Sequence, residues 1–136
     1  MNKTELFGRI EKQKDEMVNT IMELVRIPSV TGEEGEAQEF MEGLYSDLGL
    51  KTQRVHPKIE DIRNHPSFID TKESYEDRFN VVASLEGDPA KKSLIINGHI
   101  DIVSPEPVES WKYDPFEPTL EGNRLYGRGA GDMKAG

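Results

Sequence analysis

Two short segments contain residue types that bind divalent metal ions and activate water. The first, residues 98–101 (GHID), places an imidazole and a carboxylate two positions apart. Because side chains alternate along an extended chain, His99 and Asp101 are expected to point to the same side. A carboxylate beside a metal-binding histidine fixes its tautomer and strengthens its basicity. Taken alone, the pair is also compatible with a histidine at a strand end that has an incidental salt-bridge partner.

The second segment, residues 127–132 (GRGAGD), is a glycine-rich stretch that ends on the carboxylate of Asp132. Glycines allow backbone conformations that side chains forbid and let neighbouring chain approach closely. Such a loop can aim Asp132 into a cavity, where a carboxylate can bridge two cations. Two-metal hydrolases hold their ions about 3.5–4 Å apart. A plain glycine-rich turn capped by Asp132 is the alternative for this segment considered alone.

The glycine pattern excludes two nucleotide-binding loops. The dinucleotide fingerprint GxGxxG requires a glycine at the position that Asp132 occupies. The phosphate-binding loop requires Gly-Lys-Ser/Thr, which does not follow here. The sequence has no cysteine, so thiolate catalysis, thiolate ligands and disulfides are excluded as well. A metal ion in this protein must be held by histidine, aspartate or glutamate.

The hydrophobic spacing predicts the helices that position these residues. A period near 3.6 predicts a helix from Thr4 to Ile27, and Pro28 ends it. Thr31 and Glu34 match a capping box, in which Thr31 binds the Glu34 amide and the Glu34 carboxylate reaches back. This box predicts the start of a second helix, which Gly49 is suited to end.

Strands are predicted where short apolar runs lie between turn signals. The run Leu94, Ile95 and Ile96 shows no alternation, which is typical of a strand buried on both faces. Residues 57–77 are polar and contain prolines, so a long loop is expected there. Strands flanked by helices indicate the α/β class, in which ligands bind beyond the ends of central strands. The predicted strands are 51–56, 79–85, 93–97 and a hairpin over 119–126 that turns at 122–123.

Composition excludes several classes of partner. The net charge of -9 argues against binding to nucleic acid or to anionic membranes, because both attract basic surfaces. No run of about 18 apolar residues is present, so no membrane-spanning helix is expected. Residues 1–9 mix charges and lack the apolar core of a secretory signal. These features predict an acidic cytoplasmic protein of about one domain.

Three segments together resemble the M20 metallopeptidase family. They are residues 93–101 (SLIINGHID), 111–116 (WKYDPF) and 122–134 (GNRLYGRGAGDMK). Residues 27–34 also resemble the junction that follows the first helix of the family, and residues 65–83 are most similar to its deacetylase and deformylase branch. The joint occurrence of these segments, in order and at similar spacing, outweighs the separate alternatives for His99 and Asp132.

The resemblance implies a role for each matched polar residue. His99 would be a ligand of one metal ion, and Asp132 would bridge two ions. Asp101 would lie behind His99 as an active-site carboxylate, the catalytic residue of this segment. The implied cofactors are two divalent ions, zinc or cobalt, and the implied substrate is an N-acyl amino acid or a small peptide.

The resemblance also implies a domain organisation. Residues 1–136 would be the N-terminal portion of a zinc-exopeptidase-like catalytic domain, with a mixed central sheet flanked by helices. The family carries a Glu-Glu pair, another acidic ligand and a distant histidine further along, and this sequence ends at Gly136 before any such stretch. The lid domain through which many members dimerise would also lie outside residues 1–136.

The expected function is that of a di-metal hydrolase that cleaves amide bonds, here as a truncated and inactive chain whose full-length parent is a homodimer. The competing hypothesis is a non-catalytic α/β fragment or interaction module that binds metal weakly or not at all. Glu33 and Glu34 do not supply the missing pair, because they precede His99 and are explained by helix capping.

Overall fold

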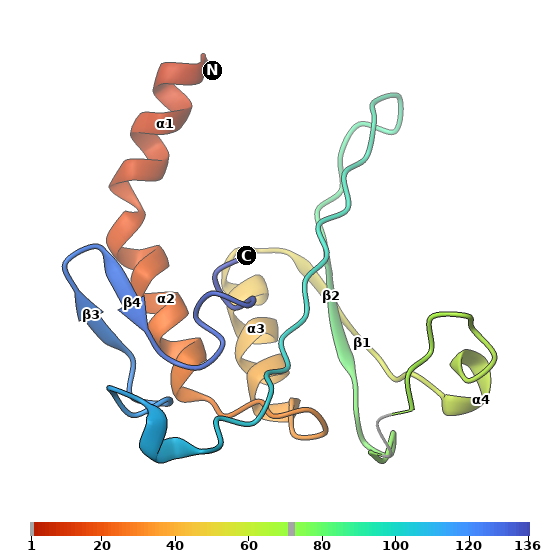
Figure 1. Cartoon of the computed structure of the whole chain (residues 1–136). Helices are drawn as coiled ribbons and strands as arrows, with labels where there is room; N and C mark the ends of the chain where they lie inside the picture. The colour runs from red at the N-terminus through yellow and green to blue at the C-terminus, as the bar shows by residue number, and fades with distance from the viewer. Residues whose placement is uncertain (1, 71–72) are drawn as a thin grey trace. The chain divides into compact units, whose positions relative to one another are not determined.

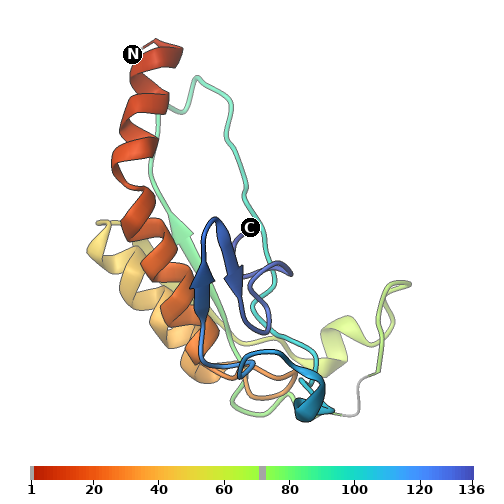
Figure 2. The same ribbon diagram turned by 60° about the vertical axis from the view of Figure 1, so that its left-hand side comes forward.

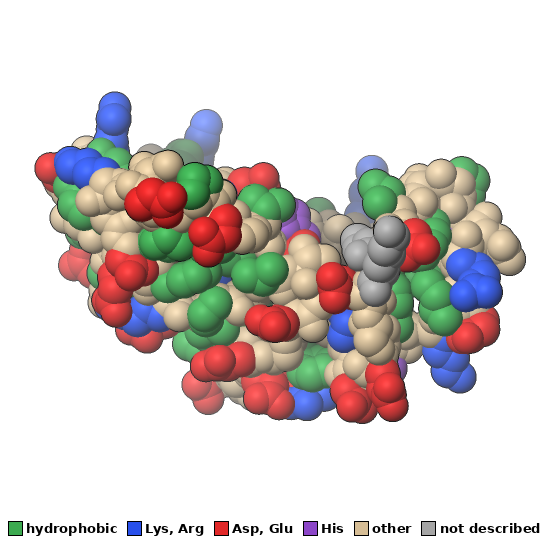
Figure 3. Space-filling view, turned by 60° about the horizontal axis from the view of Figure 1, so that its bottom comes forward, with side chains coloured by type: hydrophobic (Ala, Val, Ile, Leu, Met, Phe, Trp, Pro, Cys, Tyr) green, Lys and Arg blue, Asp and Glu red, His purple; other side chains and the backbone are tan. Residues whose placement is uncertain are grey.

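The computed structural model describes residues 2–70 and 73–136. The chain forms two compact units. Unit 1 consists of Met1–Ile27 and Pro105–Gly136, and unit 2 consists of Pro28–Ser104. Among the described residues, no helix is both long enough and apolar enough to cross a bilayer. On the face drawn in Figure 3, acidic side chains are scattered among apolar and polar ones rather than gathered in one patch.

Unit 1 begins with two consecutive helices, α1 (Lys3–Lys12) and α2 (Lys14–Arg26). The predicted helical region is therefore confirmed, but Gln13 interrupts it. Figure 1 labels the two helices one after the other along the chain. A capping box that was not predicted starts α1: Asn2 Oδ1 accepts from the Glu5 amide, and the Glu5 carboxylate accepts from the Asn2 amide, both at 2.9 Å. Ile27 is extended, so α2 ends before Pro28 as expected.

The rest of unit 1 contains a 3-10 turn, η1 (Val108–Ser110), and an antiparallel hairpin. Strand β3 (Thr119–Glu121) pairs with β4 (Arg124–Tyr126) across a turn in which Gly122 has φ 61°. The predicted hairpin is confirmed at its predicted turn. Both ribbon views place it beside α2 (Figures 1 and 2).

Unit 2 is built around α3 (Gly35–Asp47), which packs against strands β1 (Lys51–Val55) and β2 (Asn80–Ser84). The strands are antiparallel and in register from Lys51↔Ser84 to Val55↔Asn80. Ala37 is fully buried on α3. These two strands and this helix confirm the corresponding sequence predictions, and the helix and strand content is that of an α/β protein.

The end of α3 follows the sequence prediction closely. Gly49 has φ 74°, and its amide donates to the carbonyl of Ser46 at 2.8 Å. The amide of Leu50 donates to the carbonyl of Tyr45 at 3.0 Å. These two bonds form the Schellman arrangement that a left-handed glycine permits.

The predicted capping box at the start of α3 is wrong. The N-cap is Glu34, and no side chain caps it. The Glu34 carboxylate instead accepts from the Gly32 amide at 2.8 Å and from the Arg78 guanidinium at 2.7 and 3.1 Å. A charge-assisted pair with arginine is stronger than a neutral cap. The hydroxyl of Thr31 donates to Asp101 instead.

The predicted strand at residues 93–97 is also wrong. These residues, all of them described, form no strand, and Leu94, Ile95 and Ile96 are 83%, 88% and 87% exposed. An apolar run becomes a strand only when another strand accepts its backbone hydrogen bonds. Within the described part of the chain, strands form two separate two-stranded sheets, so the expected mixed central sheet is not seen there.

Residues 57–77 differ from the expected loop at one place, where the short helix α4 (Ile59–Ile62) forms. The remainder of the described part of this segment has no further helix or strand. Residues 71–72 of the predicted loop lie outside the described residues.

Candidate metal site

The candidate site in unit 2 begins with two chain segments that lie side by side. Val30 and Ile102 form a parallel β-bridge. The amide of Ile102 donates to the carbonyl of Ser29 at 2.8 Å, and the amide of Thr31 donates to the carbonyl of Ile102 at 3.3 Å. The Ser29 hydroxyl adds a 2.6 Å bond to the carbonyl of Ile100. Ser29 and Ile102 are buried, so this junction fixes the backbone on either side of Asp101.

His99 and Asp101 lie next to each other at the end of this junction. The Nδ1 atom of His99 is 3.0 Å from the carbonyl oxygen of Asp101 and 3.3 Å from its Oδ1 atom. Both partners are acceptors, so Nδ1 must carry a proton to bind them. The neutral ring then has its lone pair on Nε2. The side chains of His99 and Asp101 are 46% and 38% exposed, which leaves the pair accessible from solvent.

The second oxygen of the Asp101 carboxylate is also bound. The Thr31 hydroxyl donates to Asp101 Oδ2 at 2.9 Å. The carboxylate therefore contacts the His99 ring through one oxygen and Thr31 through the other. This arrangement is the one in which a neighbouring carboxylate orients a metal-binding imidazole.

The loop that carries Asp132 lies in unit 1 and is anchored at three points. A Cβ atom on Gly127 would collide with the side chain of Val25, so only glycine fits there. The amide of Arg128 donates to the carbonyl of Pro115 at 2.7 Å. The carbonyl of Gly129, a residue with φ 82°, accepts from the amide of Lys134 at 2.9 Å. Of the three glycines predicted to shape this loop, Gly127 is required for steric reasons and Gly129 is favoured by its positive φ.

Lys134 ties the loop to the first part of the chain. Its buried ammonium donates to the carbonyls of Leu24 at 2.7 Å and Ile27 at 2.8 Å. These carbonyls lie at the carboxyl end of α2, where helical partners are lacking and a positive charge is favourable. Burial lowers the pKa of Lys134 to about 8, so the ammonium remains protonated at pH 7.

Asp132 itself is exposed, and the peptide bond that joins it to Met133 is cis. The structure brings His99 and Asp101 together within unit 2. Asp132 belongs to unit 1, so the approach of His99 to Asp132 stays a prediction. Among residues 2–70 and 73–136, no group of three or more His, Cys, Asp or Glu is placed to hold a metal ion.

Sequence reasoning missed two residues that support the site. Thr31 was assigned to helix capping, and Lys134 was given no role of its own. Each acts on a segment far away in sequence, Thr31 on residue 101 and Lys134 on residues 24 and 27. The signal available for Lys134 was a lysine two positions after the carboxylate of a glycine-rich loop, which is weak without knowledge of what the loop packs on.

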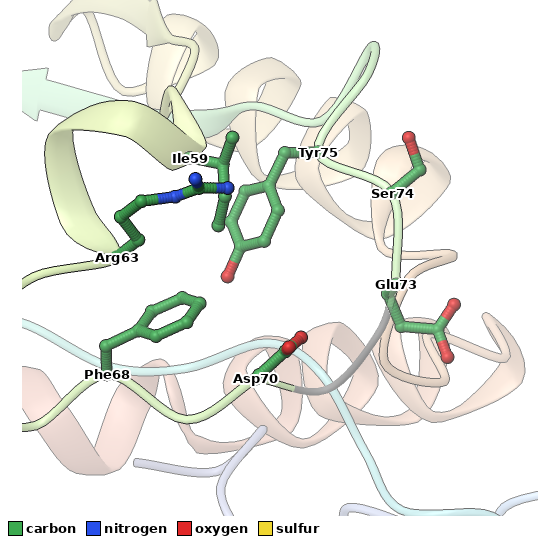
Figure 4. A pocket seen from close by; sticks show the side chains of 7 residues that line it. All are labelled: Ile59, Arg63, Phe68, Asp70, Glu73, Ser74 and Tyr75. Carbon is green, nitrogen blue, oxygen red and sulfur yellow. The ribbon is translucent and has the colours of Figure 1, made fainter.

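A separate hollow of about 470 Å³ lies in unit 2, and Figure 4 shows the side chains around it. The aromatic rings of Phe68 and Tyr75 point toward its centre, as does the guanidinium of Arg63. Its lining contains none of the predicted site residues. Among the described residues, those that line it are Ile59, Arg63, Phe68, Asp70, Glu73, Ser74 and Tyr75.

The donor set fits a divalent metal ion only in part. A protonated Nδ1 held by a carboxylate is the usual state of a metal-binding histidine, and this feature is present at His99. A zinc site normally has three or four protein ligands. The predicted set in this chain supplies two, His99 and Asp132.

The sequence of residues 95–136 matches the family described as Peptidase family M20/M25/M40. All three predicted site residues lie in this range. The chain is 35% identical over 113 residues to a succinyl-diaminopimelate desuccinylase of Methylobacterium sp., covering 83% of this chain and 25% of that protein. It is 31% identical over 137 residues to an N-formyl-4-amino-5-aminomethyl-2-methylpyrimidine deformylase of Halalkalibacterium halodurans, covering 97% of this chain and 28% of that protein.

Two solved structures resemble this fold. Human carnosine dipeptidase 1 matches with a TM-score of 0.68 at 25% identity, over 96% of this chain and 28% of that chain. The di-peptidase Dug1p from Saccharomyces cerevisiae matches with a TM-score of 0.69 at 20% identity, over the same shares of the two chains. The second likeness concerns the fold alone. This chain therefore spans about a quarter of the length of the proteins it matches.

Proposed function

Because this chain belongs to the M20 family of peptidases, we propose that it is part of a hydrolase that cleaves the amide bonds of N-acyl amino acids or small peptides. The observation that carries the proposal is the family match over residues 95–136, which contains His99, Asp101 and Asp132. The names of the related proteins describe removal of succinyl and formyl groups and cleavage of dipeptides. Each of these reactions breaks an amide bond.

His99 and Asp132 are the proposed metal ligands, and Asp101 is the proposed active-site carboxylate. The Nδ1 atom of His99 is occupied by Asp101, so the ring would offer Nε2 to a metal ion. The two oxygens of Asp132 suit a bridge between two cations. A pair of zinc or cobalt ions, when bound, supplies Lewis acidity and lowers the pKa of coordinated water to about 7.

The contribution of this chain is then to orient ligands rather than to move a proton from water. Asp101 keeps the ring of His99 in one tautomer, and its negative charge increases the basicity of the ligating nitrogen. The Gly127 and Lys134 contacts fix the loop that presents Asp132. We assign the general base and the remaining ligands to sequence outside residues 1–136.

Residues 1–136 would accordingly form the N-terminal portion of a catalytic domain. We expect these residues alone to hydrolyse no N-acyl amino acid at a useful rate, since general-base catalysis contributes about 10²–10⁴ in rate. Four further points stay predictions. They are the cytoplasmic location, the dimeric parent, the lack of nucleic-acid and membrane partners, and the choice of zinc or cobalt.

A non-catalytic interaction module is the second candidate. The observation that favours it is the lack, within the described residues, of any three-residue group able to hold a metal ion. If the chain is such a module, substitution of His99 or Asp132 should leave the turnover of any enzyme that contains the chain unchanged.

A chimera tests the proposal and separates the two candidates. The N-terminal quarter of the Methylobacterium desuccinylase is replaced by this chain, and hydrolysis of N-succinyl-diaminopimelate is measured with zinc or cobalt. We expect the chimera to turn over its substrate. Asp101→Asn should lower this turnover about 10–100-fold, which is the usual cost of losing a carboxylate behind a metal ligand. His99→Ala and Asp132→Ala are expected to abolish turnover.

His65→Gln is the matched control, because His65 is exposed and its Nδ1 only accepts from the Ser67 amide. This variant should keep the turnover of the unsubstituted chimera. A folded chimera without activity, or an active one that tolerates His99→Ala, would contradict the proposal.

A further inference from the structure

We infer that Thr31 is a positioning residue for the candidate metal ligand: its hydroxyl holds the Asp101 carboxylate in the orientation that keeps the proton on Nδ1 of His99. No direct contact between Thr31 and a metal ion or substrate is involved. The inference deepens the proposed function and rests on it for its chemical purpose, because orienting His99 matters only if His99 is a ligand.

The first support is the geometry of the carboxylate. Oδ1 of Asp101 lies 3.3 Å from His99 Nδ1, and Oδ2 accepts from the Thr31 hydroxyl at 2.9 Å. A carboxylate that bonds through one oxygen only can rotate about its Cβ–Cγ bond, since this torsion is broad. The Thr31 bond at the second oxygen restricts that rotation. Oδ1 is thereby kept facing the imidazole.

The second support is that Thr31 is placed rigidly by other groups. Its backbone amide donates to the carbonyl of Ile102 at 3.3 Å, and Val30 beside it forms the bridge to Ile102. The buried Ser29 adds bonds to residues 100 and 102. The two segments are thus held together without the Thr31 hydroxyl. Loss of that hydroxyl should disturb Asp101 more than the junction.

The third support is that the Thr31 hydroxyl does not cap the nearby helix, although its position in the sequence suits that role. A threonine three residues before a glutamate ordinarily caps a helix, yet α3 has no side-chain cap. Glu34 is engaged by Arg78. The Thr31 hydroxyl reaches instead across 70 positions of sequence to Asp101.

The consequence concerns the tautomer of His99. The proton position on an imidazole is set by the hydrogen bond that its other nitrogen makes. With Asp101 fixed, Nδ1 carries the proton and Nε2 offers its lone pair. With Asp101 able to rotate away, Nδ1 keeps only its 3.0 Å contact with the backbone carbonyl of Asp101. The preference for the Nδ1 proton then weakens, and fewer molecules present the nitrogen required for metal binding.

Nitrogen NMR of the 136-residue chain labelled with ¹⁵N-histidine tests this directly. The chain has 3 histidines, so six ring signals are expected, and those missing in His99→Gln belong to His99. Spectra are recorded at increasing pH until the ring signals stop moving, so that the tautomer is read on neutral rings. The unsubstituted chain should show His99 mainly protonated at Nδ1. A dominant Nε2 proton there overturns the inference without any variant.

Variants then assign the effect to the hydroxyl. Thr31→Val keeps the shape but removes the donor, and we expect it to lower the share of His99 rings protonated at Nδ1, where the backbone carbonyl of Asp101 is then the remaining acceptor. Thr31→Ser should restore that share. Ser29→Ala is the control, because it loosens the same junction without touching Asp101, and it should keep the preference. An unchanged share in a folded Thr31→Val chain, or an equal fall in Ser29→Ala, would show that Thr31 has only a structural role.

Zinc titration of the same samples separates this inference from the proposed function. If zinc, added up to several millimolar because we expect weak affinity in the isolated chain, leaves the His99 signals unchanged while Thr31 still sets the tautomer, the proposed metal site is wrong and the positioning contact is right. If zinc shifts the His99 signals equally in the unsubstituted and Thr31→Val chains, the metal site stands and the positioning role of Thr31 is overturned.

Discussion

The ammonium group of Lys134 lies 2.7 Å from the carbonyl oxygen of Leu24, a residue 110 positions earlier in the chain. A second bond of 2.8 Å reaches the carbonyl of Ile27. The loop that presents Asp132 is therefore fastened to the end of α2 by a buried charge. This contact explains why a lysine two positions after the proposed ligand is buried rather than solvated.

Replacing this lysine should loosen unit 1. Lys134→Met keeps the apolar part of the side chain but removes the donor to the carbonyls of Leu24 and Ile27. The Leu24 carbonyl then retains its bond from the Ile27 amide. Leaving a buried acceptor without a partner costs about 1–3 kcal/mol. Urea unfolding followed by Trp111 fluorescence reports on unit 1, because it is the single tryptophan of the chain. Lys112→Met, at an exposed ion pair with Glu121, should leave the midpoint nearly unchanged.

The close approach of Gly127 to Val25 predicts that even one added methyl group is harmful. In Gly127→Ala the new Cβ would collide with the Val25 side chain and lie 3.4 Å from the carbonyl of Pro115. Overpacking of this kind typically costs about 1–3 kcal/mol. Gly131→Ala is the matched control in the same loop, since a Cβ there meets nothing within 4 Å. Equal unfolding midpoints for the two variants, measured by tryptophan fluorescence, would mean that the loop does not pack on α2.

The exposed run Leu94, Ile95 and Ile96 predicts that the 136-residue chain self-associates. Three consecutive exposed aliphatic side chains form an apolar surface that other chains can cover. Ile95→Lys should lower the apparent mass in light scattering at high protein concentration. Thr52→Lys, a substitution on β1 outside this run, is the control and should leave association as it is. A chain that remains monomeric without substitution would contradict this expectation.

Metal affinity of the isolated chain should be weak. A zinc ion held by His99 and Asp132 alone would stay largely hydrated, because such sites normally use three or four protein ligands. Calorimetric titration with zinc is expected to show dissociation constants near the millimolar range or no measurable heat. A nanomolar site that disappears in both His99→Ala and Asp132→Ala would show that the chain recruits ligands not identified above.

The sequence predicted best those features that depend on neighbouring residues. Gly49 ends α3 because the residue after the last helical turn adopts a left-handed conformation. Gly122 lies in the turn that joins two strands adjacent in sequence. Both depend on local backbone geometry alone. The helix before Pro28 was predicted for the same reason, although the break at Gln13 was not.

Features set by distant partners were not predictable in this way. Thr31 and Glu34 have the spacing of a capping box, but Asp101 and Arg78 compete for their side chains from far along the chain. Residues 93–97 have the composition of a buried strand, and composition cannot supply the neighbouring strand. At the candidate site, the family resemblance of the sequence predicted roles for His99, Asp101 and Asp132 that stay predictions, whereas the contacts of Asp101 and of the Asp132 loop became visible only with the fold.

The central claim is that His99 and Asp132 bind the same metal site. Addition of cobalt to the ¹⁵N-labelled chain measures this most directly, because a bound paramagnetic ion shifts and broadens the signals of nearby nuclei even when affinity is weak. We expect the His99 ring and the Asp132 amide to respond together at the lowest cobalt concentration, while the His65 ring does not. We also expect Asp132→Ala to remove the response at His99. A response at only one of the two residues, or an unchanged response at His99 in Asp132→Ala, would contradict the claim.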